Sequence, residues 1–256
     1  MPLRNIGTDL SPLVFDDDYE IIDEKKLAEY IGEIILGYYL HVKKIIDQLD
    51  SGSGPTNEES IQAAIKLLNS TDSQKLKGFL FQHMSWIALA MQYKTTNLKM
   101  VRPHDAPAQQ GIDGLAILLC DDGLIDKIII TEDKCSKEPR KRIQSEVYPE
   151  FDDFESGKSN NKIVSGITSL VGYDENLLKK IEPNIVNKSL WQYRIGVTRN
   201  DNYQTPNDRK ALFNDYDKHV FGSQERRHAA TIYIPDTDNW SENLKDKIIQ
   251  YLNSRK

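Results

Sequence analysis

Two carboxylates and a lysine in this sequence are spaced so that a β-hairpin would bring them together. Asp113 opens an apolar run, and a second apolar run ends with Glu132 and Lys134. Residues 121–123 between the runs read Asp-Asp-Gly, which is typical of a tight turn because glycine tolerates the positive φ that hairpins need. Side chains alternate faces along a strand, so Glu132 and Lys134 should share one face beside Asp113.

This combination of side chains is suited to metal-assisted cleavage of a phosphodiester. The carboxylates of Asp113 and Glu132 would hold Mg²⁺, with Mn²⁺ expected to substitute, and Lys134 would orient the attacking water or stabilise the developing charge. The alternative is that charged residues simply end a hairpin, because an Asp…Glu-x-Lys pattern at loose spacing also arises by chance. The glycines around Asp113 and the Ile-rich run before Glu132 favour the catalytic interpretation.

Asp113, Glu132 and Lys134 occupy the signature positions of a known pattern, and the sequence resembles the PD-(D/E)XK nuclease superfamily. Ile112 stands where the pattern has its proline. Further along, Gln144 and Tyr148 resemble the Gln-x-x-x-Tyr element of the RecB-like branch, where the pair supports the site and the DNA. Four residues apart, they would lie on one side of a helix that Pro149 limits.

A basic run precedes that pair. Arg140, Lys141 and Arg142 follow Lys137 closely, and a cationic cluster just after a metal site is typical of a surface that contacts phosphates. The alternative is a solvated basic turn, since most charge runs are only surface.

A third acidic group is expected on an N-terminal helix over residues 24–49. Both sides of this helix carry apolar residues, so a glutamate on it must be paired or bound to a metal. The superfamily resemblance implies a glutamate on the first core helix that reaches the metal, with Glu33 as the candidate and Glu29 as the second choice. The alternative is a glutamate held in a structural ion pair.

The remaining pattern predicts an α/β protein with a restriction-endonuclease-like mixed sheet flanked by helices on both faces. We expect a helical N-terminal region over residues 1–95 and the nuclease core over 96–256, forming one compact unit. The segment at 50–55 reads as a flexible joint. The other predicted elements are helices over 57–69, 73–94 and 207–219, one or two short helices over 160–181, strands at 190–197 and 230–234, and an amphipathic C-terminal helix.

Two histidines differ in their surroundings. His83 lies in the apolar stripe of the helix at 73–94 and is predicted to be a core residue. His104 lies in a polar loop ahead of Asp113 and could approach the metal or the substrate, although a single histidine is a weak signal.

The composition limits the possible partners. The 256 residues carry 33 Lys and Arg against 39 Asp and Glu, a net charge of −6. Because binding to duplex DNA depends on neutralising phosphates, the basic surface must be local or a partner must supply much of the affinity. No apolar leader follows Met1, and no stretch approaches the ~20 residues of a membrane helix, so a cytoplasmic protein is expected.

The order of these features along the chain resembles HamA, the family of nuclease subunits in Hachiman anti-phage systems. The likeness rests on residues 31–36, 79–86, 110–114 and 132–134. It implies a bacterial defence effector that cleaves DNA with little sequence specificity and is held by a helicase partner of the HamB type. The alternatives are a self-contained restriction or Cap4-like nuclease, and a non-catalytic adaptor that keeps the nuclease fold.

Overall fold

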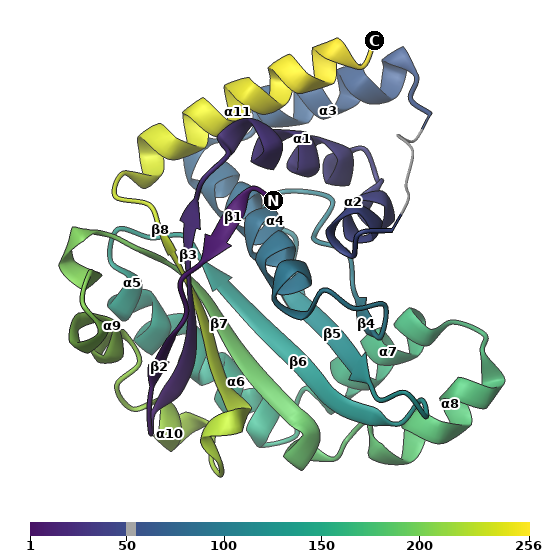
Figure 1. The fold of residues 1–256 in the computed structure, drawn as a ribbon, viewed down its shortest axis with the longest axis vertical. Coiled ribbons are helices and arrows are strands. Elements are labelled where there is room, and N and C mark those ends of the chain that lie inside the picture. Colours follow the sequence, from purple (N-terminus) through teal and green to yellow (C-terminus); the bar gives the residue numbers. More distant parts are fainter. Residues whose placement is uncertain (50–54) are drawn as a thin grey trace.

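The chain folds around one twisted sheet with helices on both faces (Figure 1). The computed structural model describes residues 1–49 and 55–256, so most of the predicted joint at 50–55 lies outside the described residues. The described strands are β1 (Leu3–Asn5), β2 (Thr8–Leu10), β3 (Val14–Ile21), β4 (Leu98–Met100), β5 (Gly114–Leu119), β6 (Ile125–Lys134), β7 (Trp191–Arg199) and β8 (Arg227–Tyr233).

The sheet is mixed, as predicted. The order of its strands is β1-β3-β8-β7-β6-β5-β4, and β2 pairs with β3 off this path. Strands β3, β8, β7 and β6 run parallel to their neighbours within this group, whereas β5 and β4 continue from β6 in antiparallel fashion. The predicted hairpin is therefore β5–β6, and its turn contains Gly123 at φ +82°.

One face of the sheet carries the helices from the two ends of the chain, and the other carries the central helices. The first group is α1 (Glu24–Ile35), α2 (Tyr39–Ile46), α3 (Glu58–Ser70), α4 (Ser73–Tyr93) and α11 (Thr237–Ser254). The second group is α5 (Pro139–Arg142), α6 (Tyr148–Glu155), α7 (Asn160–Val171), α8 (Glu175–Ile181), α9 (Pro206–Leu212) and α10 (Tyr216–His219). In the parts of the chain that the structure describes, no helix has the length and apolar character needed to cross a membrane.

Three predicted helices differ from the structure for local reasons. The predicted helix at 24–49 is two helices, because Gly37 at φ +93° breaks it between α1 and α2. The predicted helix at 207–219 is interrupted before α10, where Asp215 has φ +72°. Pro149 does not end its helix: it lies in the first turn of α6, after the π-helical turn Ile143–Val147, which changes the backbone hydrogen-bond spacing there.

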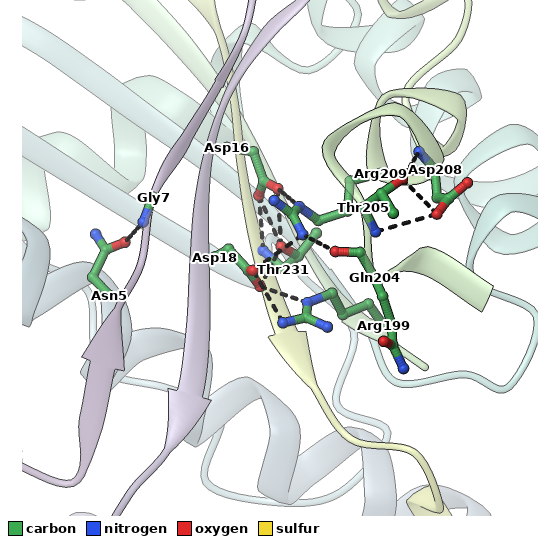
Figure 2. A network of polar contacts seen from close by, with 10 residues as sticks. All are labelled: Asn5, Gly7, Asp16, Asp18, Arg199, Gln204, Thr205, Asp208, Arg209 and Thr231. Atoms are coloured by element: carbon green, nitrogen blue, oxygen red, sulfur yellow. Dashed lines mark hydrogen bonds and ion pairs between the residues drawn. The ribbon is translucent and has the colours of Figure 1, made fainter. Parts of the chain in front are cut away.

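Residues 1–95 are not only helical, because they also supply three strands of the sheet. Strand β3 contains an acidic run, and two of its residues, Asp16 and Asp18, are almost completely buried beside β8. Figure 2 shows what compensates their charges: Arg199 Nε lies 2.6 Å from Asp18 Oδ1, and Arg209 Nε lies 3.3 Å from Asp16 Oδ2. Burial and the neighbouring Asp18 carboxylate still raise the pKa of Asp16 to about 7.

Candidate active site

The β5–β6 hairpin brings Asp113, Glu132 and Lys134 to one place. Gly114, the first residue of β5, pairs with Thr131, so Asp113 lies at the end of β6 where Glu132 and Lys134 stand. The Lys134 ammonium lies 3.8 Å from Asp113 Oδ2 and 3.6 Å from Glu132 Oε2. The lysine thus bridges two carboxylates, one directly before β5 and one on β6.

Burial makes this group electrostatically unusual. The side chain of Glu132 is only 2% exposed, and its Oε1 atom accepts no hydrogen bond from the described residues. Burial, followed by repulsion from Asp113, raises the pKa of Glu132 well above its ordinary value, although Lys134 opposes the shift. Burial is the largest single influence on Lys134 and disfavours its charged form, but the combined attraction of the surrounding carboxylates, of which Glu132 and Asp113 contribute most, raises the pKa of that lysine.

Two further glutamates approach from the helical segment after β6. Glu146 Oε2 lies 4.0 Å from Lys134 Nζ, and the charge of Glu150 raises the pKa of both Glu132 and Lys134. Neither residue was singled out from the sequence. Their i, i+4 spacing, soon after the Glu-x-Lys pattern, was the signal that could have found them.

Gln144 and Tyr148 are not brought into this group. Gln144 is exposed, whereas Tyr148 is buried in the core on the α6 face of the sheet. The Tyr148 hydroxyl donates a hydrogen bond to the Asn214 carbonyl at 3.0 Å, and its ring stacks on His219 at 4.3 Å. In this chain, therefore, Tyr148 attaches α6 to α10, and the DNA-supporting role that the resemblance implies for Gln144 and Tyr148 stays a prediction.

The basic run after β6 is largely engaged with protein groups. The Arg140 guanidinium donates to the carbonyls of Leu212 and Asn214, at 3.0 Å and 2.7 Å, and it also pairs with Asp215. Arg140 is therefore a structural residue rather than an open phosphate contact.

The two residues beside Arg140 are more accessible. Lys141 lies 3.5 Å from Glu138, and Arg142 pairs with Glu146. Both side chains are more than half exposed, so they remain accessible to a ligand.

Glu33 lies elsewhere, at the contact between α1 and α11. Its Oε1 atom accepts a hydrogen bond from the Tyr251 hydroxyl and lies 3.1 Å from Arg255 Nε. Glu29 pairs instead with Lys26 at 3.2 Å. The structural ion pair considered as the alternative for Glu33 is what the structure contains, and neither glutamate is placed with Asp113 and Glu132.

The helix that faces the site is α4, not α1. Gln82 Nε2 donates a hydrogen bond to the Asp113 carbonyl at 2.8 Å and lies 3.3 Å from Asp113 Oδ1. The same nitrogen is 3.2 Å from His104 Nδ1, and because an amide N–H only donates, this contact places the proton of a neutral His104 on Nε2. The sequence signal for Gln82 was a lone amide within a long, otherwise mainly apolar stretch of helix.

A cleft of about 190 Å³ opens between α4 and the hairpin end. Asp113, Asp133 and Lys134 line it from the end of the hairpin, while Gln82 and His104 line it from the opposite wall. His104 thus shares the cleft with the predicted site residues. His83 does not: it is 1% exposed, contacts the Phe79 carbonyl through Nδ1, and is a core residue as predicted.

The residues present fit a hard divalent cation. Asp113 and Glu132 offer carboxylate oxygens, and Glu132 Oε1 is a buried acceptor without a donor among the described residues. The same part of the chain holds no group of three or more His, Cys, Asp or Glu side chains placed to bind a metal. Two carboxylates suffice for Mg²⁺, which usually keeps several waters and takes further oxygens from substrate phosphates.

Comparisons with protein-family models, with curated proteins and with solved structures find no match to this chain. The residues of the site and their geometry are therefore the basis for the function proposed below.

Proposed function

We propose that this chain is a Mg²⁺-dependent DNA nuclease. The observation that carries the proposal is the position of Lys134 Nζ within 4 Å of both Asp113 and Glu132, at the edge of an open cleft. Water attacks phosphorus in such a reaction, and the P–O bond to the leaving sugar breaks. A bound Mg²⁺ would supply a nucleophilic water and neutralise phosphate charge.

The protein groups would have separate tasks. Asp113 and Glu132 would hold the cation, while Lys134 would place its ammonium against the phosphate oxygens as negative charge develops on them. Gln82 would keep the Asp113 carboxylate in place through its hydrogen bond to the Asp113 carbonyl. The mixed sheet, with its active edge at the end of an antiparallel hairpin, agrees with the restriction-endonuclease-like core expected from the resemblance.

The surface beside the cleft supports a partner-dependent form of this activity, as the HamA resemblance implies. Arg140 is held by carbonyls, and the charges of Lys141 and Arg142 are offset by Glu138 and Glu146. Little uncompensated positive charge is left there to grip DNA phosphates. We therefore propose a bacterial defence effector whose DNA engagement and restraint depend on a helicase subunit.

The test is a cleavage assay on supercoiled plasmid and on linear duplex, with the chain purified alone and with the product of a neighbouring helicase gene. We expect Mg²⁺-dependent cleavage that Asp113→Asn and Lys134→Ala abolish. Matched controls are Asp126→Asn and Lys127→Ala. These residues lie at the beginning of β6, at the opposite end of the strand from Lys134, so both variants should cleave normally.

The possible outcomes separate the alternatives. Cleavage that needs no helicase and is confined to specific sequences would favour a self-contained restriction-type nuclease. Absence of cleavage under every condition, including the helicase and Mn²⁺, would contradict the nuclease proposal and favour a non-catalytic adaptor.

A further inference from the structure

The residue between Glu132 and Lys134 points to the other face of the sheet. Glu132 and Lys134 alternate with Asp133 along β6, so the Asp133 side chain turns toward α4. There its Oδ1 atom accepts a hydrogen bond from the Ser85 hydroxyl at 2.6 Å. The Ser85 hydroxyl is itself held, because Arg194 donates a hydrogen bond to it at 2.8 Å, and both Ser85 and Arg194 are buried.

The neighbouring strand leaves space for this carboxylate. Gly196 of β7 pairs with Asp133 in the parallel register. A Cβ atom at position 196 would lie 1.9 Å from Asp133 Oδ1 and 2.8 Å from Ser85 Oγ. Both distances are shorter than real Cβ contacts, so any side chain at 196 would displace the Asp133 carboxylate from its hydrogen bond with Ser85.

The backbone N–H of Asp133 holds the carboxylate of Asp113. The pairing of β5 with β6 ends at Gly114 and Thr131, so the Asp133 N–H lies beyond the last backbone partner in β5. The Asp113 carboxylate takes that place: its Oδ2 atom accepts a hydrogen bond from the Asp133 N–H at 3.0 Å. The position of the Asp133 backbone therefore sets the position of the Asp113 carboxylate.

We propose that Asp133 is a positioning residue for the site, with its side chain anchored by Ser85 above Gly196 and its backbone N–H fixing the Asp113 carboxylate beside Lys134. The inference rests on the proposed function in one respect, since it takes Asp113 as a group that binds the cation. It extends that function by connecting the site to Ser85 and Arg194, which lie outside the cleft wall formed by Gln82 and His104.

The alternative is that Ser85 and Asp133 only join α4 to the sheet. A purely structural contact would change stability when broken and leave cation binding as it was. A positioning role predicts weaker cation binding instead. Removing a group that orients a metal ligand usually lowers metal affinity or activity by about 10–100-fold.

The first measurement is independent of catalysis. Amide hydrogen exchange at Asp133 in metal-free protein should become faster in Ser85→Ala and in Asp113→Ala, because each removes one end of the connection. Ser241→Ala is the matched control, a buried helical serine in α11 whose hydroxyl bonds the Asp238 carbonyl. Unchanged exchange at Asp133 in Ser85→Ala would overturn the proposal even if the protein proves to be a nuclease.

The second measurement is Mn²⁺ binding followed by electron paramagnetic resonance. We expect Ser85→Ala and Asp133→Ala to weaken binding about tenfold or more. Asp133→Asn keeps an oxygen acceptor for Ser85, so its Mn²⁺ affinity should stay close to that of the wild type and above that of Asp133→Ala. Equal Mn²⁺ affinity in the wild type and both alanine variants would overturn the proposal.

Gly196→Ala is a second way to displace the Asp133 carboxylate from Ser85. Thermal unfolding of this variant shows whether it keeps the fold. If Gly196→Ala does not fold, the Ser85→Ala and Asp133→Ala measurements decide alone. If the wild type binds Mn²⁺ but cleaves no DNA, the nuclease proposal fails while the positioning role of Asp133 stands or falls on exchange and affinity.

Discussion

The side-chain amide of Gln82 lies 2.8 Å from the backbone carbonyl oxygen of Asp113 and fixes the start of β5 against α4. Removing this contact with Gln82→Ala should free the Asp113 carboxylate and lower the rate of DNA cleavage by about 10–100-fold. Single-turnover kinetics on a labelled duplex would measure the effect. Gln74→Ala, an exposed residue on the wall of the same cleft, is the control and should retain the wild-type rate.

Glu132→Gln should abolish cleavage and stabilise the metal-free protein. Because burial and Asp113 raise the pKa of Glu132, the folded state binds a proton more readily than the unfolded chain does. The wild type therefore loses stability as pH rises above the ordinary glutamate pKa, and the neutral glutamine avoids this loss.

Urea unfolding in a chelator at pH 5 and pH 8 would measure the Glu132→Gln effect. The advantage of the variant should be larger at pH 8, and Mg²⁺ should reduce it by binding the wild-type carboxylate. An advantage that is the same at both pH values would contradict the electrostatic explanation.

Glu33→Ala should weaken the protein without affecting the site. The substitution leaves Arg255 and the Tyr251 hydroxyl without their shared acceptor, and breaking a buried ion pair costs about 3 kcal/mol. Denaturant unfolding would measure the loss, and Mn²⁺ affinity should be unchanged. A weakened Mn²⁺ affinity in this variant, with Glu29→Gln as the control, would restore Glu33 as a metal ligand.

His83 should contribute a pH-dependent loss of stability in acid. Burial lowers its pKa from 6.5 to about 4, so between these values the unfolded chain takes up a proton that the folded state does not. Stability from this residue is complete above pH 6.5 and falls as the pH drops toward 4, by on the order of 3 kcal/mol in total.

The measurement for His83 is the difference in the free energy of unfolding between the wild type and His83→Gln at each pH. The wild-type pH profile alone is not sufficient, because carboxylates with raised pKa values change its stability in the opposite direction. Glutamine can still donate to the Phe79 carbonyl, so the variant should fold. If the free-energy difference between the two proteins does not change from pH 7 to pH 4.5, the histidine is not the titrating group.

The hairpin was predictable because its signals are local. Asp-Asp-Gly at 121–123 marks the turn, and the alternation of residues in β6 places Glu132 and Lys134 on one face. Strand β3 was not predicted because its acidic run reads as solvent-exposed. Asp16 and Asp18 can be buried because arginines at positions 199 and 209 and the hydroxyl of Thr231 reach them, and contacts between such distant positions leave no local pattern.

The candidate site also contains residues with a local sequence signal and residues whose roles depend on long-range contacts. The sequence indicated that a glutamate on the covered N-terminal helix needs a partner, but it could not say whether Glu33 meets a metal or Arg255. Gln82 and Ser85 gave only a weak signal, as polar residues within a mainly apolar helix. Their roles depend on which side of α4 faces the hairpin end, and that is decided by tertiary packing.

The pairing of β3 with β8 determines the order in which the strands can join the sheet during translation. Phe15 is made before its partner His228, which is 213 positions later in the sequence, a delay of about 10–40 s at 5–20 residues per second. During that time β3 has no parallel neighbour, and the arginines that neutralise its aspartates, Arg199 and Arg209, are made only toward the end of the interval. Strands β4 to β7 can meanwhile pair among themselves. We therefore expect the hairpin that holds Asp113 and Glu132 to assemble during translation, and β3, with its antiparallel partners β1 and β2, to join the parallel strands last.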